Sequence, residues 1–117
     1  LTQGFAPLEQ HNHGNIGPWS DIYAIGATMY ACITGKPPPS SPERIKKDKL
    51  EAEIRTFEKK KYSRSLLEAI NAAMKMDMTQ RPQSIDEFLL LLDADVSASS
   101  KIMSFLNKPV LGNGRKN

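Results

Sequence analysis

Residues 22–34, IYAIGATMYACIT, decide the fold because this run contains no charged residue. Ser20 is the expected N-cap, since a serine oxygen accepts hydrogen bonds from the free N–H groups of a first helical turn. Gly35 is the expected C-cap, and the prolines at 37–39 prevent the helix from continuing. A helix that is apolar on every face must be enclosed by other elements, and this one is too short to cross a membrane. We therefore predict a buried central helix within a larger helical domain.

Two further helices are expected after the prolines. Pro42 stands at a typical first helical position. Residues 43–61 carry only a thin apolar stripe among many charged residues, which predicts a surface helix that loosens into the lysines at 59–61. Ser63 begins the next helix, whose apolar residues recur every three or four positions as far as about residue 76.

The end of the chain contains one strong helix signal and one weak one. Ser84 and Glu87 form a capping box in front of the apolar run 88–92, which predicts a helix there. A weaker helix is expected at about 98–107. Because no stretch shows the alternating pattern of a half-buried strand, the predicted fold class is all-α.

The composition is that of an ordinary globular protein, with 117 residues, 39% hydrophobic and 25% charged. The net charge of +3 is too small to indicate nucleic-acid binding by itself. Cys32 is the single cysteine, which excludes an internal disulfide and favours a reducing, cytoplasmic location. No apolar run approaches the roughly 20 residues that a membrane span needs, so we expect no membrane association. Leu1 is not a methionine, and we expect the chain to be a piece of a longer protein.

Residues 2–10, TQGFAPLEQ, are similar to the segment that ends the activation loop in the C-terminal lobe of eukaryotic-like, bacterial-type Ser/Thr protein kinases. Residues 19–26, WSDIYAIG, followed by TGKPP at 34–38, resemble the start and the end of kinase helix F. Residues 76–82, MDMTQRP, resemble the connector before the last helix. Their order and spacing around a charge-free helix make the resemblance specific.

The resemblance implies a domain division and an activity. Residues 1–95 match part of a kinase C-lobe, from the substrate-binding loop through helices F to I, and residues 96–117 are left as a C-terminal extension. The implied parent transfers the γ-phosphate of ATP to Ser or Thr of a protein substrate.

The resemblance also implies roles for individual residues. Glu9 and Arg81 match a buried ion pair that ties the substrate loop to the helical base, although solvated charges are the alternative. Asp21 matches an aspartate that anchors the catalytic loop, and a role at the N-terminus of its own helix is compatible with that. Thr2 matches a threonine that supports the catalytic loop. The implied substrate-binding residues are Thr2, Gly4, Phe5, Ala6 and Pro7.

Three positions depart from the family pattern. Pro7-Leu8 stands where Ala-Pro is usual, Met78 where a proline is usual, and Gln3 where the proline after Thr2 is usual. None of these changes removes a charge partner. They therefore bear on the substrate preference rather than on the fold.

The motifs that hold ATP in a kinase are not found in these 117 residues. A kinase needs a glycine-rich loop, a β3 lysine, an H-R-D catalytic loop and a D-F-G metal ligand. We therefore expect no catalytic residue and no cofactor in this chain, which alone would be inactive, and ATP and Mg²⁺ in the parent. The expected partners are the missing N-lobe and catalytic loop, a protein substrate, and a second copy through exposed apolar surface.

Two other function classes remain open at this stage. The first is a non-catalytic, pseudokinase-like protein interaction module. The second, which the sequence favours less, is a nucleic-acid binder that uses the basic face of residues 43–61.

The remaining reactive side chains have simpler explanations. His11 and His13 suggest a metal site, but Cys32 is the only further nitrogen or sulfur ligand, so loop histidines are favoured and no metal is expected. Cys32 lacks a neighbouring base, which favours a small core residue over a nucleophile. The lysines at 59–61 are read as a solvated run, with docking to an acidic partner as the alternative.

Overall fold

A computed structural model describes residues 3–60 and 62–93 of the chain. These residues form helices and contain no strand, which confirms the all-α prediction for the part described. The expected helix at about 98–107 lies outside that part. The elements, in chain order, are α1 (Leu8–His11), α2 (Pro18–Thr34), α3 (Ser41–Lys46), α4 (Leu50–Arg55), η1 (Thr56–Lys60), α5 (Arg64–Ala73), η2 (Met78–Gln80) and α6 (Ile85–Leu92).

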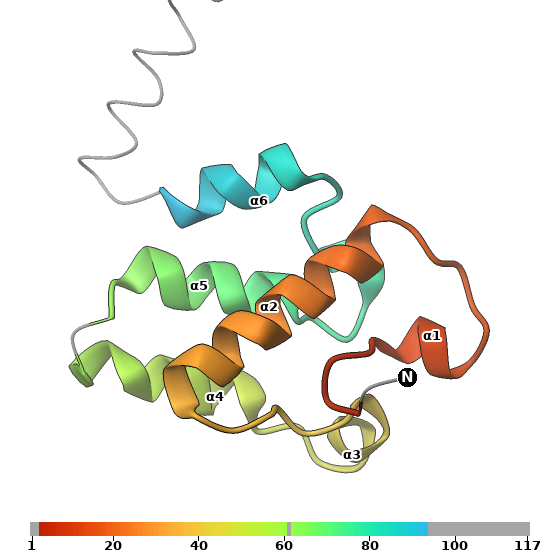
Figure 1. Ribbon diagram of the computed structural model, residues 1–117, viewed down its shortest axis with the longest axis horizontal. Helices are drawn as coiled ribbons and strands as arrows, with labels where there is room; N and C mark the ends of the chain where they lie inside the picture. Colours follow the sequence, from red (N-terminus) through yellow and green to blue (C-terminus); the bar gives the residue numbers. More distant parts are fainter. Residues whose placement is uncertain (1–2, 61, 94–117) are drawn as a thin grey trace, which may run out of the picture.

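Helix α5 lies between α4 and α6, and α2 runs obliquely across α5 (Figure 1). The larger core cluster lies where α2, α4 and α5 meet. It consists of Tyr23, Ala27, Tyr30, Leu50, Ile54, Leu67, Ile70 and Met74. A smaller cluster, made by Ile22, Ala69, Ala73 and Phe88, holds α6 against α2 and α5. Burial of these apolar side chains, at about 25 cal/mol per Å², is the main force that joins the helices.

The long helix α2 begins earlier than predicted. Its N-cap is Gly17 and its first residue is Pro18, whose fixed φ suits a first helical position. Ser20 is therefore not the N-cap but lies in the first turn, where its Oγ accepts a hydrogen bond from the Gly17 N–H at 3.3 Å. The end is as predicted, because Gly35 adopts a left-handed conformation with φ of 76° and its N–H donates to the Ala31 carbonyl.

Helix α2 is central, but only one of its faces is buried within the described residues. The buried face consists of Ile22, Tyr23, Gly26, Ala27 and Tyr30. Ile25, Thr28 and Cys32 on the other face are exposed, and no described element covers them. The prediction that Cys32 is a core residue is therefore wrong for this structure. None of the described helices is long and apolar enough to cross a membrane.

The single helix predicted over residues 43–61 is instead divided into α3, α4 and η1. Helix α3 begins with a capping box in which Ser40 and Glu43 exchange hydrogen bonds. It ends at Lys46, because the next residue, Lys47, has extended backbone angles. Asp48 then accepts a hydrogen bond from the Leu50 N–H at 3.2 Å, which fixes the turn into α4. Local polar contacts of these side chains therefore interrupt a helix that the thin apolar stripe alone could not maintain.

The last two helices begin where the sequence predicts. Ser63 and Ser84 are the N-caps of α5 and α6, and each side chain accepts a hydrogen bond from a backbone N–H three residues later. Helix α5 ends at Ala73, earlier than the predicted residue 76, because the backbone turns at Met74. This turn leads the chain into the connector that carries Arg81.

Gly26 lets α2 and α5 approach closely. A Cβ atom at this position would lie 2.8 Å from the Cβ of Ala73 and 3.0 Å from the Cγ of Met74. A side chain at position 26 would force α2 and α5 apart, because the atoms that it would meet belong to the buried core.

We expect Gly26→Val to lower the free energy of unfolding by about 1–3 kcal/mol or more, since it overpacks the contact between α2 and α5. Thr28→Val places the same residue on the exposed face of α2 and is the matched control. Urea unfolding of both variants measures the difference. Equal stability of Gly26→Val and the wild type would contradict the close helix packing.

Candidate functional site

The loop over residues 3–9 is joined to the helical base by a buried ion pair between Glu9 and Arg81. The Arg81 Nη1 lies 2.7 Å from the Glu9 Oε2, and Nη2 lies 3.1 Å from Oε1. Glu9 is 7% exposed and Arg81 is 3% exposed. This two-pronged geometry uses the planar guanidinium fully and fixes both the position and the orientation of the carboxylate.

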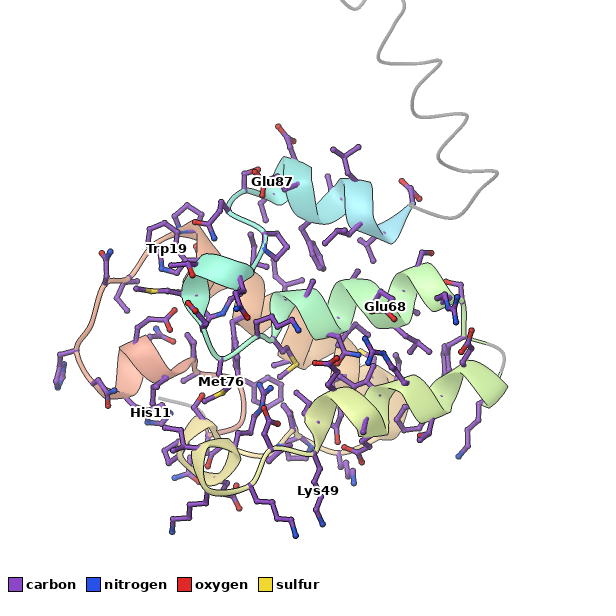
Figure 2. The ribbon with its side chains drawn as sticks, turned by 180° about the vertical axis from the view of Figure 1, so that it is seen from behind. His11, Trp19, Lys49, Glu68, Met76 and Glu87 are labelled. Carbon is purple, nitrogen blue, oxygen red and sulfur yellow. The ribbon has the colours of Figure 1, made fainter. Side chains whose placement is uncertain are left out.

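The remaining donors of Arg81 are also satisfied inside the protein. Its Nε donates to the Lys75 carbonyl at 2.7 Å. Its Nη1 and Nη2 donate to the carbonyls of Trp19 and Met76 at 3.1 and 3.3 Å. All five N–H donors of the guanidinium are thus in use. In Figure 2, the labelled Trp19 and Met76 mark the two segments that Arg81 joins to the loop.

Local structure places each partner of the ion pair. Glu9 lies in the first turn of α1, where a carboxylate is favoured by the free N–H groups. Arg81 directly follows η2, whose first turn is held by Asp77. The Asp77 Oδ1 accepts hydrogen bonds from the backbone N–H and the hydroxyl of Thr79, at 2.9 and 2.7 Å. These bonds lower the pKa of Asp77 and keep it ionised.

The surroundings of Glu9 stabilise its charged form. Burial by itself raises the pKa of Glu9, but hydrogen bonds from Arg81 and Ser20 outweigh it and hold this pKa below the usual 4.5. The Ser20 hydroxyl donates to the Glu9 Oε2 at 2.6 Å. Glu9 therefore remains an ionised structural group and is not suited to donate a proton near neutral pH.

Tyr23 packs its ring against the same guanidinium. The Arg81 Cζ lies 4.8 Å from the centre of the Tyr23 ring, and Tyr23 is fully buried. An arginine over a buried aromatic face gains cation–π attraction in addition to its hydrogen bonds. Helix α2 thus stabilises the ion pair by packing the Tyr23 ring against the Arg81 guanidinium.

The loop itself is packed tightly against the segment between α2 and α3. Gly4 has a φ of 90°, and a Cβ atom there would lie 2.5 Å from the Pro38 carbonyl oxygen. The carbonyl of Ala6 accepts a hydrogen bond from the Ser41 Oγ at 2.8 Å. Only a glycine meets both the backbone angle and the space available at position 4.

The structure places the sequence-predicted site residues in different environments. Gly4, Ala6 and Pro7 are buried and shape the loop from within, whereas Phe5 is half-buried. Asp21 is exposed in the first turn of α2 and accepts no side-chain hydrogen bond from the residues that the structure describes. Thr2 lies outside the described residues.

Sequence reasoning missed Ser41, Arg44 and the ring of Tyr23. Ser41 is completely buried, and Arg44 is 5% exposed although it lies in the stretch 43–61 that predicts a surface helix. One signal was available, because Arg44 and Asp48 are four residues apart and can pair on one helix face. The structure shows this pair, at 2.9 Å.

The described residues offer no metal site. No group of three or more His, Cys, Asp or Glu side chains lies together among residues 3–60 and 62–93. His13 is exposed on a turn with a φ of 53°, and His11 lies at the end of α1. A largely apolar depression of about 290 Å³ lies between α1 and residues 76–78.

We expect Glu9→Gln to lower the stability near neutral pH and to flatten the acid dependence of unfolding. The pKa of Glu9 is lowered by folding, so its contribution is complete above pH 4.5 and is lost as the pH falls through the folded value. Urea unfolding from neutral pH to below pH 4.5 measures this effect. Glu58→Gln, at an exposed ion pair, is the control. Parallel curves for Glu9→Gln and the wild type would contradict the assignment.

We expect Gly4→Ala to destabilise the protein more than Gly35→Ala. Both glycines have positive φ, so each alanine carries backbone strain of about 1 kcal/mol. Only position 4 also meets a backbone oxygen, whereas nothing lies within 4 Å of a Cβ atom at Gly35. Thermal unfolding of the two variants distinguishes the backbone strain, which both carry, from the clash with Pro38, which only Gly4→Ala has. Equal losses of stability would show that the loop does not pack on Pro38.

Comparison with known proteins finds two similarities, and no protein-family model matches the chain. A probable protein kinase of Dictyostelium discoideum is 33% identical over 91 residues, which cover 75% of this chain and 11% of that protein. The solved apo form of PpkA-294 is 40% identical to this chain and superimposes with a TM-score of 0.66. That match covers 79% of this chain and 32% of the solved chain, so this chain spans well under half of either relative. In sequence and in fold, the chain is therefore similar to the C-terminal helical lobe of a protein kinase.

Proposed function

We propose that residues 3–9 form the substrate-positioning loop of a Ser/Thr protein kinase and that the Glu9–Arg81 pair holds this loop on the helical base. The observation that carries the proposal is the saturation of Arg81, which joins the loop to the start of α2 and to the connector before α6. The similarity of the chain to protein kinases supports a kinase-related function, within which we propose this role.

A rigid loop matters in this reaction because phosphoryl transfer depends mainly on positioning and electrostatics. The acceptor hydroxyl must lie in line with the phosphorus atom, and a misplacement of about 1 Å can lower the rate about a hundredfold. Gly4, Ala6 and Pro7 are buried, so the main chain of the loop is fixed by packing against the rest of the protein. The half-buried Phe5 is then the predicted contact for the substrate side chain beside the acceptor.

We propose that ATP and Mg²⁺ are held by parts of the parent protein other than the described residues. The described residues contain no cluster of metal-ligating side chains, and the sequence contains no glycine-rich phosphate loop. When bound in the parent protein, ATP would supply the phosphoryl group and Mg²⁺ would neutralise its charge. The proposal therefore assigns to this chain the holding of the peptide substrate only, with Asp21 as the predicted contact to the catalytic loop.

A second candidate function is a non-catalytic, pseudokinase-like interaction module. Four large apolar side chains on α2 and α6 are exposed, which favours contact with another protein: Ile25, Ile85, Leu89 and Leu90. The gene sequence that precedes residue 1 distinguishes the two functions. The presence of the H-R-D and D-F-G aspartates supports the enzyme, and their replacement supports the interaction module.

We expect Arg81→Ala in the parent kinase to lower kcat/KM for a peptide substrate by about tenfold or more, because the loop loses its anchor. The variant also leaves the Glu9 charge buried and unpaired, which costs about 3–5 kcal/mol. Arg81→Lys keeps the charge but loses the bidentate geometry, so we expect its kcat/KM to lie between those of the wild type and Arg81→Ala.

The control is Arg55→Ala, which removes an exposed arginine paired with Glu51 and Glu68. Phosphotransfer from radiolabelled ATP to a Ser/Thr peptide measures the activity, and thermal unfolding identifies variants that do not fold. A folded Arg81→Ala or Arg81→Lys protein with wild-type kinetics would contradict the proposed role of the ion pair.

A further inference from the structure

A second contact holds the loop, at a point separate from the ion pair. The Ser41 Oγ lies 2.8 Å from the Ala6 carbonyl oxygen, and it must be the donor because a carbonyl can only accept. Ser41 is completely buried and Ala6 is 4% exposed. A buried carbonyl in an irregular loop is costly to leave without a partner, so this bond fixes the main chain beside Phe5.

The Ser41 hydroxyl is itself supported by two further side chains. The Tyr23 Oη lies 3.4 Å from the Ser41 Oγ. Since the single Ser41 proton is directed to Ala6, Tyr23 must donate its own proton to Ser41. The Arg44 Nη1 in turn donates to the Tyr23 Oη at 3.1 Å. The result is a one-way chain of hydrogen bonds from a guanidinium to the loop carbonyl, in which each bond polarises the next.

The position of Arg44, at the start of this series of hydrogen bonds, is fixed by its other contacts. Its Nε and Nη2 each donate to one oxygen of Asp48 at 2.9 Å. Its Nη1 also donates to the Met74 carbonyl at 2.6 Å, at the end of α5. An exposed Arg–Asp pair on a helix would contribute little, but here the guanidinium is 5% exposed and reaches the core.

Tyr23 connects the two attachments of the loop. Its ring packs on Arg81 of the ion pair at 4.8 Å, while its hydroxyl belongs to the Arg44–Ser41 chain. A shift of this side chain would disturb the loop at Ala6 and at Glu9 together.

We propose that Ser41, Tyr23 and Arg44 form a second anchor, which positions the loop main chain at Ala6 for recognition of the peptide substrate. This inference rests on the proposed function of the loop. The three residues act through the loop and not on the substrate, so they are positioning residues. They set how tightly the peptide is held, and ATP binding does not depend on them.

Ser41→Ala is the direct test, and Ser63→Ala is its matched control. Each variant loses one serine hydroxyl that makes a hydrogen bond to the main chain. Ser63, however, is the exposed N-cap of α5 and is far from the loop in sequence. Tyr23→Phe is a second variant that removes only a hydroxyl and keeps the ring on Arg81, so it remains informative if Ser41→Ala folds poorly.

The first measurement is amide hydrogen exchange in the full-length protein, which requires no catalysis. The backbone amides of Gln10, Asn12 and Gly14, which follow the loop in sequence, donate hydrogen bonds to the carbonyls of residues 7–9 at its end. We expect Ser41→Ala to speed their exchange about fivefold, the ratio for loss of one buried hydrogen bond, and Tyr23→Phe to act in the same direction. Exchange equal to that of Ser63→Ala would overturn the anchor.

The second measurement is steady-state kinetics with a Ser/Thr peptide. We expect Ser41→Ala to raise the KM for the peptide about tenfold and to leave the KM for ATP unchanged, while Ser63→Ala changes neither. Faster exchange with an unchanged peptide KM would overturn the positioning role. If the wild-type protein transfers no phosphate, the proposed function fails, and the exchange measurement still supports or overturns the anchor by itself.

Discussion

Arg81 is the residue on which the described structure depends. A buried guanidinium keeps its charge and must direct every N–H to an acceptor, because an unpaired buried charge is very costly. Here the acceptors are the Glu9 carboxylate and the carbonyls of Trp19, Lys75 and Met76. Three segments that are distant in sequence must therefore meet at one point. This requirement fixes the end of the loop at Glu9.

Helix α2 is the element that makes this meeting possible. Its first turn supplies the Trp19 carbonyl and the Ser20 hydroxyl to the ion pair. One turn further, Tyr23 packs its ring on Arg81 and directs its hydroxyl toward the contact with Ser41. Gly26 then allows α5 to approach, and the turn after α5 leads to the connector that carries Arg81. Within α2, the stretch without charged residues, 22–34, supplies the side chains that are buried against the core.

Sequence patterns predict the features that depend on neighbouring residues. Gly35, Ser63 and Ser84 end or begin helices as expected, because a cap is a contact between residues three or four positions apart. The prediction fails where distant contacts compete with the local pattern. Residues 43–61 have the composition of a solvated helix, yet Arg44 turns inward because the Met74 carbonyl and the Tyr23 hydroxyl lie within its reach. Cys32 looks like a core residue by composition, yet no described element covers its face of α2.

The sequence by itself determined the helical class, the charge-free central helix and, through the resemblance to kinases, the candidate pair of Glu9 and Arg81. Spacing and caps are enough for the first two, and short motifs in a fixed order are enough for the third. Only the tertiary structure decided that this pair is buried and fully bonded, and that Ser41, Tyr23 and Arg44 hold the same loop from a second side. The physical reason is that burial and the direction of a hydrogen bond depend on which helices pack together, and neither can be read from the order of residues alone.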